Sequence, residues 1–242
     1  MPDWALRSYV LRRGRTRPAW RAAYEREKSH LLPFCRHFVD FETTFGRMAP
    51  VVLEIGFGMG ESLVAQARAC PETNFLGVEV HTPGVARTLK EISCLGLANL
   101  RLIEHDAIEV LSFMIAPASL WGVQIFFPDP WPKKRHHKRR LVTAPFASLV
   151  QGRLLPGGFL HFATDFRAYG LFMQSLFQAY FSEAPPPPLL QSKFARRAAK
   201  AGMAVQEGFF RRLPRLGLQC QGTSETLRAF GKKRTPHPRA GG

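Results

Sequence analysis

From residue 51 onward, the chain alternates short apolar runs with longer amphipathic segments. We predict strands over residues 51–58, 74–80, 99–106, 122–129 and 157–165, separated by helices. Strands that are apolar along almost their whole length are typical of a parallel sheet covered by helices on both faces. The pattern therefore predicts a doubly wound, Rossmann-like α/β fold with a mostly parallel sheet.

Two further elements complete the predicted domain. The last helix before the fifth strand is predicted over residues 139–154, and "VQEGFFRRL" at residues 205–213 predicts one more strand. A chain of 242 residues can bury one large core. We therefore expect a basic N-terminal arm with a short helix over residues 1–47, a main domain over residues 48–213 and a basic, flexible C-terminal extension over residues 214–242.

The charge of the chain points to a polyanionic partner. Lysine and arginine number 34 against 18 acidic residues, a net charge of +16, and such an excess favours nucleic acid. No apolar stretch approaches the ~20 residues of a membrane span, and no signal peptide precedes the basic N-terminus. The four cysteines form no close pair, so neither a disulfide framework nor a metal site is expected. We expect a cytoplasmic protein without membrane contact, either a monomer or a homodimer.

A glycine-rich turn, "LEIGFGMGES", follows the first predicted strand. Gly56 and Gly58 let the backbone approach a ligand closely, where doubly wound folds bind their cofactors. A nicotinamide fold would carry a third glycine where this chain has Glu61. With Glu54 just upstream, that acid would repel a diphosphate and would suit a cationic cofactor such as S-adenosylmethionine. The alternatives are a nicotinamide oxidoreductase, which this turn disfavours, and a turn that only packs helix against strand.

Acidic residues also end the next three predicted strands. Glu79 ends the second strand, where a carboxylate can accept hydrogen bonds from ribose hydroxyls. Asp106 ends the third strand and could meet an adenine edge, or it could cap the following helix. Asp129 ends the fourth strand between two prolines that restrict the backbone, and its alternative role is a simple Asp-Pro turn. Together these strand-end acids resemble those of the class I methyltransferase fold.

Eight consecutive basic residues, "KKRHHKRR" at residues 133–140, follow Asp129 and Trp131. They could bind the phosphates of a nucleic acid close to the end of the fourth strand, while Trp131 offers a face on which a base could stack. A nuclear import signal is the alternative. Because the run lies between a strand and a helix of the domain rather than in a tail, substrate binding is favoured.

Several motifs together resemble the bacterial tRNA (guanine-N7)-methyltransferase family. They are "LEIGFGMGESLVAQA", "FLGVEVHTPGV", "HDAIEVL", "FFPDPWPKKRHHKRRLV" and "PGGFLHFATDF", in the family's order and spacing over about residues 51–169, with "RSYVLRRGR" near the start. Of these, "FFPDPW" with its basic run is the most specific. The resemblance implies a class I methyltransferase fold and transfer of a methyl group from S-adenosylmethionine to N7 of a guanine in the tRNA variable loop.

The resemblance also implies roles for individual residues. The two glycines of the turn, Gly56 and Gly58, are added to the cofactor-binding residues. Cofactor binding falls to Glu54, Gly56, Gly58, Glu79, Asp106 and Asp129, catalysis to Asp129, substrate binding to Lys133, Asp165, Ser192 and Lys193, and RNA contacts to Arg135, His136, His137, Lys138, Arg139 and Arg140.

The C-terminal third departs from the pattern of that family. Where the family carries T-K-F-E-x-R-G, this chain has "SKFARRA" at residues 192–198, with Ala195 in the position of the glutamate. Glu225 could supply an acid from the extension. A catalytically impaired or substrate-shifted paralogue that binds RNA is therefore the alternative function. The intact strand-end acids argue against it, because loss of function would be expected to affect cofactor residues as well.

Overall fold

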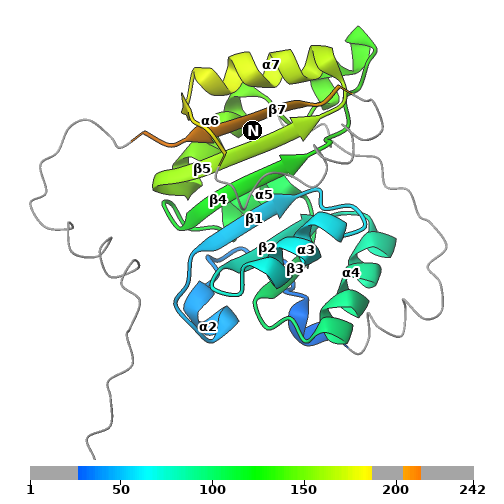
Figure 1. The fold of residues 1–242 in the computed structure, drawn as a ribbon, viewed down its shortest axis with the longest axis vertical. Coiled ribbons are helices and arrows are strands. Elements are labelled where there is room, and N and C mark those ends of the chain that lie inside the picture. Colours follow the sequence, from blue (N-terminus) through cyan, green and yellow to red (C-terminus); the bar gives the residue numbers. More distant parts are fainter. Residues whose placement is uncertain (1–26, 187–203, 214–242) are drawn as a thin grey trace, which may run out of the picture.

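The apolar runs of the sequence become the strands of one seven-stranded sheet. The computed structural model describes residues 27–186 and 204–213. The strands lie in the order β3-β2-β1-β4-β5-β7-β6 (Figure 1). They are β1 (Val51–Ile55), β2 (Asn74–Glu79), β3 (Leu100–Glu104), β4 (Leu120–Phe126), β5 (Leu154–Thr164), β6 (Ser182–Glu183) and β7 (Gln206–Arg211). Strands β1 to β5 pair in parallel and β7 is antiparallel to both of its neighbours, which confirms the predicted mostly parallel sheet.

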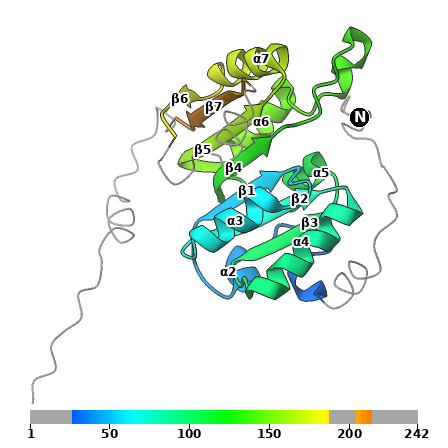
Figure 2. The same cartoon turned by 45° about the vertical axis from the view of Figure 1, so that its right-hand side comes forward.

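Helices cover both faces of this sheet (Figures 1 and 2). They are α2 (Phe41–Phe45), α3 (Glu61–Ala69), α4 (Thr82–Leu95), α5 (Ala107–Phe113), α6 (Ala144–Arg153) and α7 (Arg167–Gln178), with 3₁₀ turns η1 (Lys28–His30) and η2 (Lys134–Arg139). None of the helices in the described ranges has the length and apolar character needed to cross a membrane. The order of these helices and strands along the chain confirms the predicted alternation of strand and helix.

Strand β1 lies at the centre and is buried along its whole length. Side chains of a strand alternate between the two faces of its sheet. Val51, Leu53 and Ile55 accordingly join the core formed with α5, α6 and α7, whereas Val52 joins the core formed with α3 and α4. This two-sided burial is why every residue of β1 except Glu54 is apolar.

The helix predicted over residues 139–154 is shorter in the structure. Helix α6 begins at Ala144, and its N-cap Thr143 accepts a hydrogen bond from the Phe146 backbone N–H at 3.4 Å. Pro145 explains the difference, because a proline inside a helix lacks the N–H that would bond four residues back. The basic residues before it form η2 instead, and β5 begins at Leu154, earlier than predicted.

Residues 31–45 pack against the domain although they lie outside the alternating pattern. Leu32 N–H donates to the Leu102 carbonyl on the outer edge of β3, and Val39 N–H donates to the Met114 carbonyl, both at 2.8 Å. The Phe34 ring stacks on His105 with 3.7 Å between ring centroids. Residues 1–26 of the predicted N-terminal arm and the predicted C-terminal extension lie outside the described residues.

Helix α4 touches the turn that follows β1. A Cβ atom added to Gly84 would lie 2.0 Å from the Gly58 carbonyl oxygen, a backbone atom that cannot rotate away. Gly152, which also lies within a helix, has no atom within 4 Å of such a Cβ. The two glycines therefore test whether this contact matters.

We predict that Gly84→Ala lowers the free energy of unfolding by about 1–3 kcal/mol, because the added methyl forces α4 and the glycine turn apart. The matched change Gly152→Ala should raise it by about 0.5–1 kcal/mol, since alanine is the better helix former. Urea unfolding of both variants measures the difference. Equal midpoints for Gly84→Ala and the unsubstituted protein would contradict the contact.

Candidate active site

A cavity of about 560 Å³ opens at the carboxyl ends of β1, β2, β3 and β4. In doubly wound sheets, ligands bind outside the carboxyl ends of the strands, at the point in the sheet where the strand order reverses. The wall of the cavity comes from residues 55–56, 78–81, 105, 107, 126–132 and 141. Four of the predicted functional segments therefore meet at one place.

The glycine turn follows β1, and its first residue, Gly56, lines this cavity. Gly56 and Gly58 have φ angles of +71° and +56°, a left-handed conformation that favours glycine. A Cβ atom at either position would meet nothing within 4 Å. The turn therefore leaves bare backbone where a ligand can approach it.

Glu79 ties the end of β2 to the glycine turn. One carboxylate oxygen accepts the Gly58 backbone N–H at 2.8 Å, and the other accepts those of Val80 at 2.7 Å and His81 at 3.0 Å. A carboxylate oxygen has two lone pairs, so the oxygen that accepts only the Gly58 N–H can accept one further hydrogen bond. The side chain can therefore bind a ligand hydroxyl while it continues to hold the turn.

Glu54 is buried at 2% exposure directly before the turn and is not among the residues that line the cavity. Gln66 donates to its carboxylate from α3 at 3.3 Å, and Gln124 of β4 donates to Gln66 at 2.8 Å. Burial, together with the negative charge of Glu79, raises the pKa of Glu54 to about 8. A cation placed beside Glu54 would lower this pKa, so the environment of this acid suits a positively charged ligand.

Asp106 takes the capping role that the sequence left open. One of its carboxylate oxygens accepts the backbone N–H groups of Ile108 at 2.8 Å and Glu109 at 3.1 Å, which fixes the N-terminus of α5. Its neighbours His105 and Ala107 line the cavity. The sequence analysis did not single out His105, because a lone histidine after a strand carries no motif.

Asp129 is exposed on the cavity wall in a loop bounded by two left-handed residues. Phe127 has φ +51° and Trp131 has φ +42°, which are costly for side chains other than glycine. Phe127 N–H donates to the Ala163 carbonyl of β5 at 2.7 Å and so fixes the start of the loop. The loop "FPDPW" therefore presents Asp129 in a constrained geometry.

Trp131 packs within the basic turn. Its ring meets that of His136 edge to face at 5.7 Å, and the Arg139 guanidinium carbon lies 5.1 Å from the ring centroid. Partial burial and the surrounding positive charges lower the pKa of His136. In this structure the indole contacts its own chain, and its buried N–H finds no acceptor among the described residues.

The other basic side chains differ in exposure. Lys133, Arg135, His137 and Lys138 are exposed on η2 and the residue before it, where they can reach phosphates. Arg140 is half-buried and lies over the ring of Tyr169, a residue that the sequence analysis overlooked.

Asp165 is exposed immediately after β5, and β7 begins opposite Thr164. Asp165 and the first residue of β7 therefore lie at the edge of the sheet that carries the cavity. Of the other expected residues, Ser192, Lys193, Ala195 and Glu225 lie outside the described residues. Within the part of the chain that the structure describes, no three histidine, cysteine or acidic side chains gather as a metal site would require.

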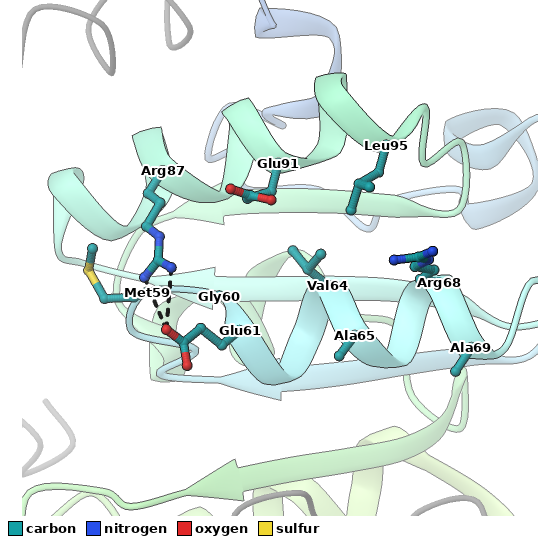
Figure 3. Close-up of a pocket in the computed structure, with 10 residues that line it drawn as sticks. All are labelled: Met59, Gly60, Glu61, Val64, Ala65, Arg68, Ala69, Arg87, Glu91 and Leu95. Carbon is teal, nitrogen blue, oxygen red and sulfur yellow. Dashed lines mark hydrogen bonds and ion pairs between the residues drawn. The ribbon is translucent and has the colours of Figure 1, made fainter.

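Glu61, which stands in place of the third glycine of a nicotinamide turn, lies away from the strand-end cavity. Glu61 instead forms an ion pair with Arg87 at 3.3 Å (Figure 3), at one end of a separate hollow of about 530 Å³ between α3 and α4. Arg87 offsets its charge, and Glu61 is not among the residues of the strand-end cavity.

Comparison with known proteins shows what the chain is similar to. Residues 48–206 match the model of a family described as "Putative methyltransferase". The tRNA (guanine-N(7)-)-methyltransferase of Thiobacillus denitrificans is 46% identical over 218 residues, which cover 86% of this chain and 95% of that protein. The enzyme of the same name from Methylobacillus flagellatus is 48% identical over 219 residues, covering 86% and 91%.

Solved structures support the fold alone. The aminoglycoside resistance methyltransferase NpmB1 has a TM-score of 0.52 at 13% identity and covers 71% of this chain and 91% of that one. The 16S rRNA methyltransferase KamB has a TM-score of 0.51 at 15% identity, with coverage of 74% and 95%. The doubly wound sheet is therefore shared with methyltransferases of very different sequence.

We predict that Glu54→Gln makes the free protein increasingly more stable than the unsubstituted one as the pH rises from 5 to 8. Between the usual pKa of 4.5 and the raised value of about 8, the unfolded chain releases the Glu54 proton while the folded protein keeps it. The free energy of unfolding then falls by up to about 1.4 kcal/mol per pH unit. Glutamine does not titrate, and above pH 8 the difference should level off. Urea unfolding at pH 5, 6.5, 8 and 9 checks this, and a difference that is the same at every pH would contradict it.

Proposed function

Because the chain belongs to the tRNA (guanine-N7)-methyltransferase family, we propose that its strand-end cavity brings the cofactor to a guanine of the tRNA variable loop, and that Asp129 holds this guanine. The protein transfers a methyl group from S-adenosylmethionine to guanine N7 in tRNA. The observation that supports the proposed site is the position of Asp129, which lies on the wall of the cavity and directly before the basic turn.

The proposed cofactor site uses the glycine turn and two acids. S-adenosylmethionine supplies a methyl group bound to a positively charged sulfur. The bare backbone at Gly56 and Gly58 gives it room, and Glu79 can accept a ribose hydroxyl through its one remaining lone pair. Glu54 is the buried acid whose ionisation a nearby cation favours, and Asp106 fixes the adjacent helix end.

Guanine N7 already carries an in-plane lone pair, so no general base has to remove a proton from it. The task of the protein is to align N7 with the methyl group, and positioning of this kind can contribute about 7–11 kcal/mol. The Asp129 carboxylate would accept the N1 and N2 hydrogens on the opposite edge of the base. As N7 becomes methylated the purine gains positive charge, which a carboxylate at that edge stabilises.

The phosphates of the tRNA would lie along the basic turn. Lys133, Arg135 and Lys138 are exposed there and can neutralise phosphates without sequence preference. Asp165 at the same edge of the sheet is a further substrate contact by the family resemblance, as are Ser192 and Lys193. With tRNA as its substrate, the protein would act in the cytoplasm.

One observation favours a second candidate function. Ala195 stands where the resembling family carries a glutamate, so a protein that binds RNA with impaired or shifted methylation is the alternative. The cavity and its acids favour the catalytic function.

We predict that labelled methyl groups pass from S-adenosylmethionine to unmodified tRNA transcripts, and not to transcripts that lack the variable-loop guanine. Transfer to the first transcripts alone would establish the site and show that Ala195 is tolerated. Binding of tRNA and cofactor with no transfer to any transcript would favour the second candidate.

Asp129→Asn should lower the single-turnover rate by about 10²-fold or more, because the amide N–H₂ opposes the hydrogens of guanine and the stabilising charge is lost. Lys90→Ala, at an exposed position on α4, is the control and should keep the full rate. If Asp129→Asn retains the full rate with cofactor bound, the assignment of Asp129 is wrong.

A further inference from the structure

Arg140, the last residue of the basic run, is directed inward. Its Nε donates to the Pro130 carbonyl at 2.9 Å. Its guanidinium carbon lies 4.6 Å from the ring centroid of Tyr169 and 6.0 Å from that of Phe172, both on α7. The side chain therefore links the residue after Asp129 to a helix of the core.

The platform beneath Arg140 is itself fixed. Tyr169 is fully buried, and its hydroxyl accepts the Val142 backbone N–H at 3.3 Å. Burial raises the pKa of Tyr169 to about 12, so the ring stays neutral. A cation over a neutral aromatic face is attracted to it, and a planar guanidinium is well suited to that position.

The Asp129 loop needs such support at its second end. A non-glycine residue stays in a left-handed conformation only where its surroundings hold it there. The Ala163 carbonyl holds Phe127 at the start of the loop. At the other end the contacts come from η2 and its C-cap: Arg139 lies over Trp131, and Arg140 donates to Pro130.

We propose that Arg140 is a positioning residue that holds the Pro130 carbonyl against α7 and thereby sets the place of Asp129, rather than a phosphate contact. This inference rests on the proposed function, in which Asp129 grips guanine. The exposed side chains of the basic run then bind RNA, whereas Arg140 keeps the Asp129 loop in its conformation.

The two roles predict different behaviour on substitution. A phosphate contact depends on charge, so lysine at position 140 would largely preserve it, and its removal would lower the salt dependence of tRNA binding. A positioning residue depends on the planar guanidinium and the direction of its Nε–H, which lysine cannot reproduce. Arg140→Lys therefore separates the two roles.

The experiment compares Arg140→Lys and Arg140→Ala with Lys138→Ala and Lys90→Ala. Lys138 is an exposed residue of the same basic turn, and Lys90 lies on α4. For each protein, tRNA affinity is measured between 50 and 200 mM salt, and the single-turnover methylation rate is measured at saturating tRNA and cofactor. Thermal unfolding confirms that each variant is folded at the assay temperature.

Both Arg140 variants should lose at least about tenfold in single-turnover rate, as expected when a reacting group is displaced. Their plots of log affinity against log salt should keep the slope of the unsubstituted protein. Lys138→Ala, which removes a phosphate contact, should lose about one unit of that slope. Lys90→Ala should change neither quantity.

A full rate for Arg140→Lys, with a slope reduced by about one for Arg140→Ala, would overturn the inference. Failure of the unsubstituted protein to methylate tRNA would instead contradict the proposed function. In that case the loop is followed without turnover through the indole ¹H–¹⁵N resonance of Trp131, assigned with Trp131→Phe. That resonance should shift in both Arg140 variants and stay in place in Lys90→Ala, and an unshifted resonance in Arg140→Lys would also overturn the inference.

Discussion

The parallel pairing of β1 with both β2 and β4 is the constraint on which the site depends. In this register Ile55 lies beside Val78 on one side and Ile125 on the other, so the three strands end together. The segments that leave those ends are the glycine turn, the acid-bearing end of β2 and the Asp129 loop. Chemistry encoded more than seventy residues apart in the sequence is thus gathered at one edge of the sheet.

The two acids beside the glycine turn have different environments. Glu79 accepts three backbone N–H groups, which satisfy its carboxylate. Among the described residues, Glu54 receives a hydrogen bond from the amide of Gln66 alone, and its burial raises its pKa. Gln124 lies beside Glu54 in the sheet and supports Gln66. The unsatisfied acid is the one suited to a cation, and the satisfied one maintains the shape of the cavity.

The sequence alone could predict the sheet, the glycine turn and the position of Asp129, because these depend on periodicity and on residues close together in the chain. It could not predict the ion pair of Glu61, whose partner Arg87 lies on another helix. The start predicted for α6, at residue 139, was too early because it overlooked Thr143 and Pro145, which are visible start signals. The inward direction of Arg140 was hidden for another reason: a run of basic residues shows its charge but not which side chains face the core. Gln124 was detectable, since a polar residue inside an apolar strand is itself a signal.

The contact of residues 31–45 with β3 bears on where this protein can be cut. The family match begins at residue 48, after that segment. A fragment that started there would lose Leu32 from the edge of β3 and Phe34 from the face of His105. An uncovered strand edge is a template for pairing with another chain, so such a fragment would be prone to aggregate. The smallest well-behaved unit of this protein is therefore longer than the stretch of sequence by which its family is recognised.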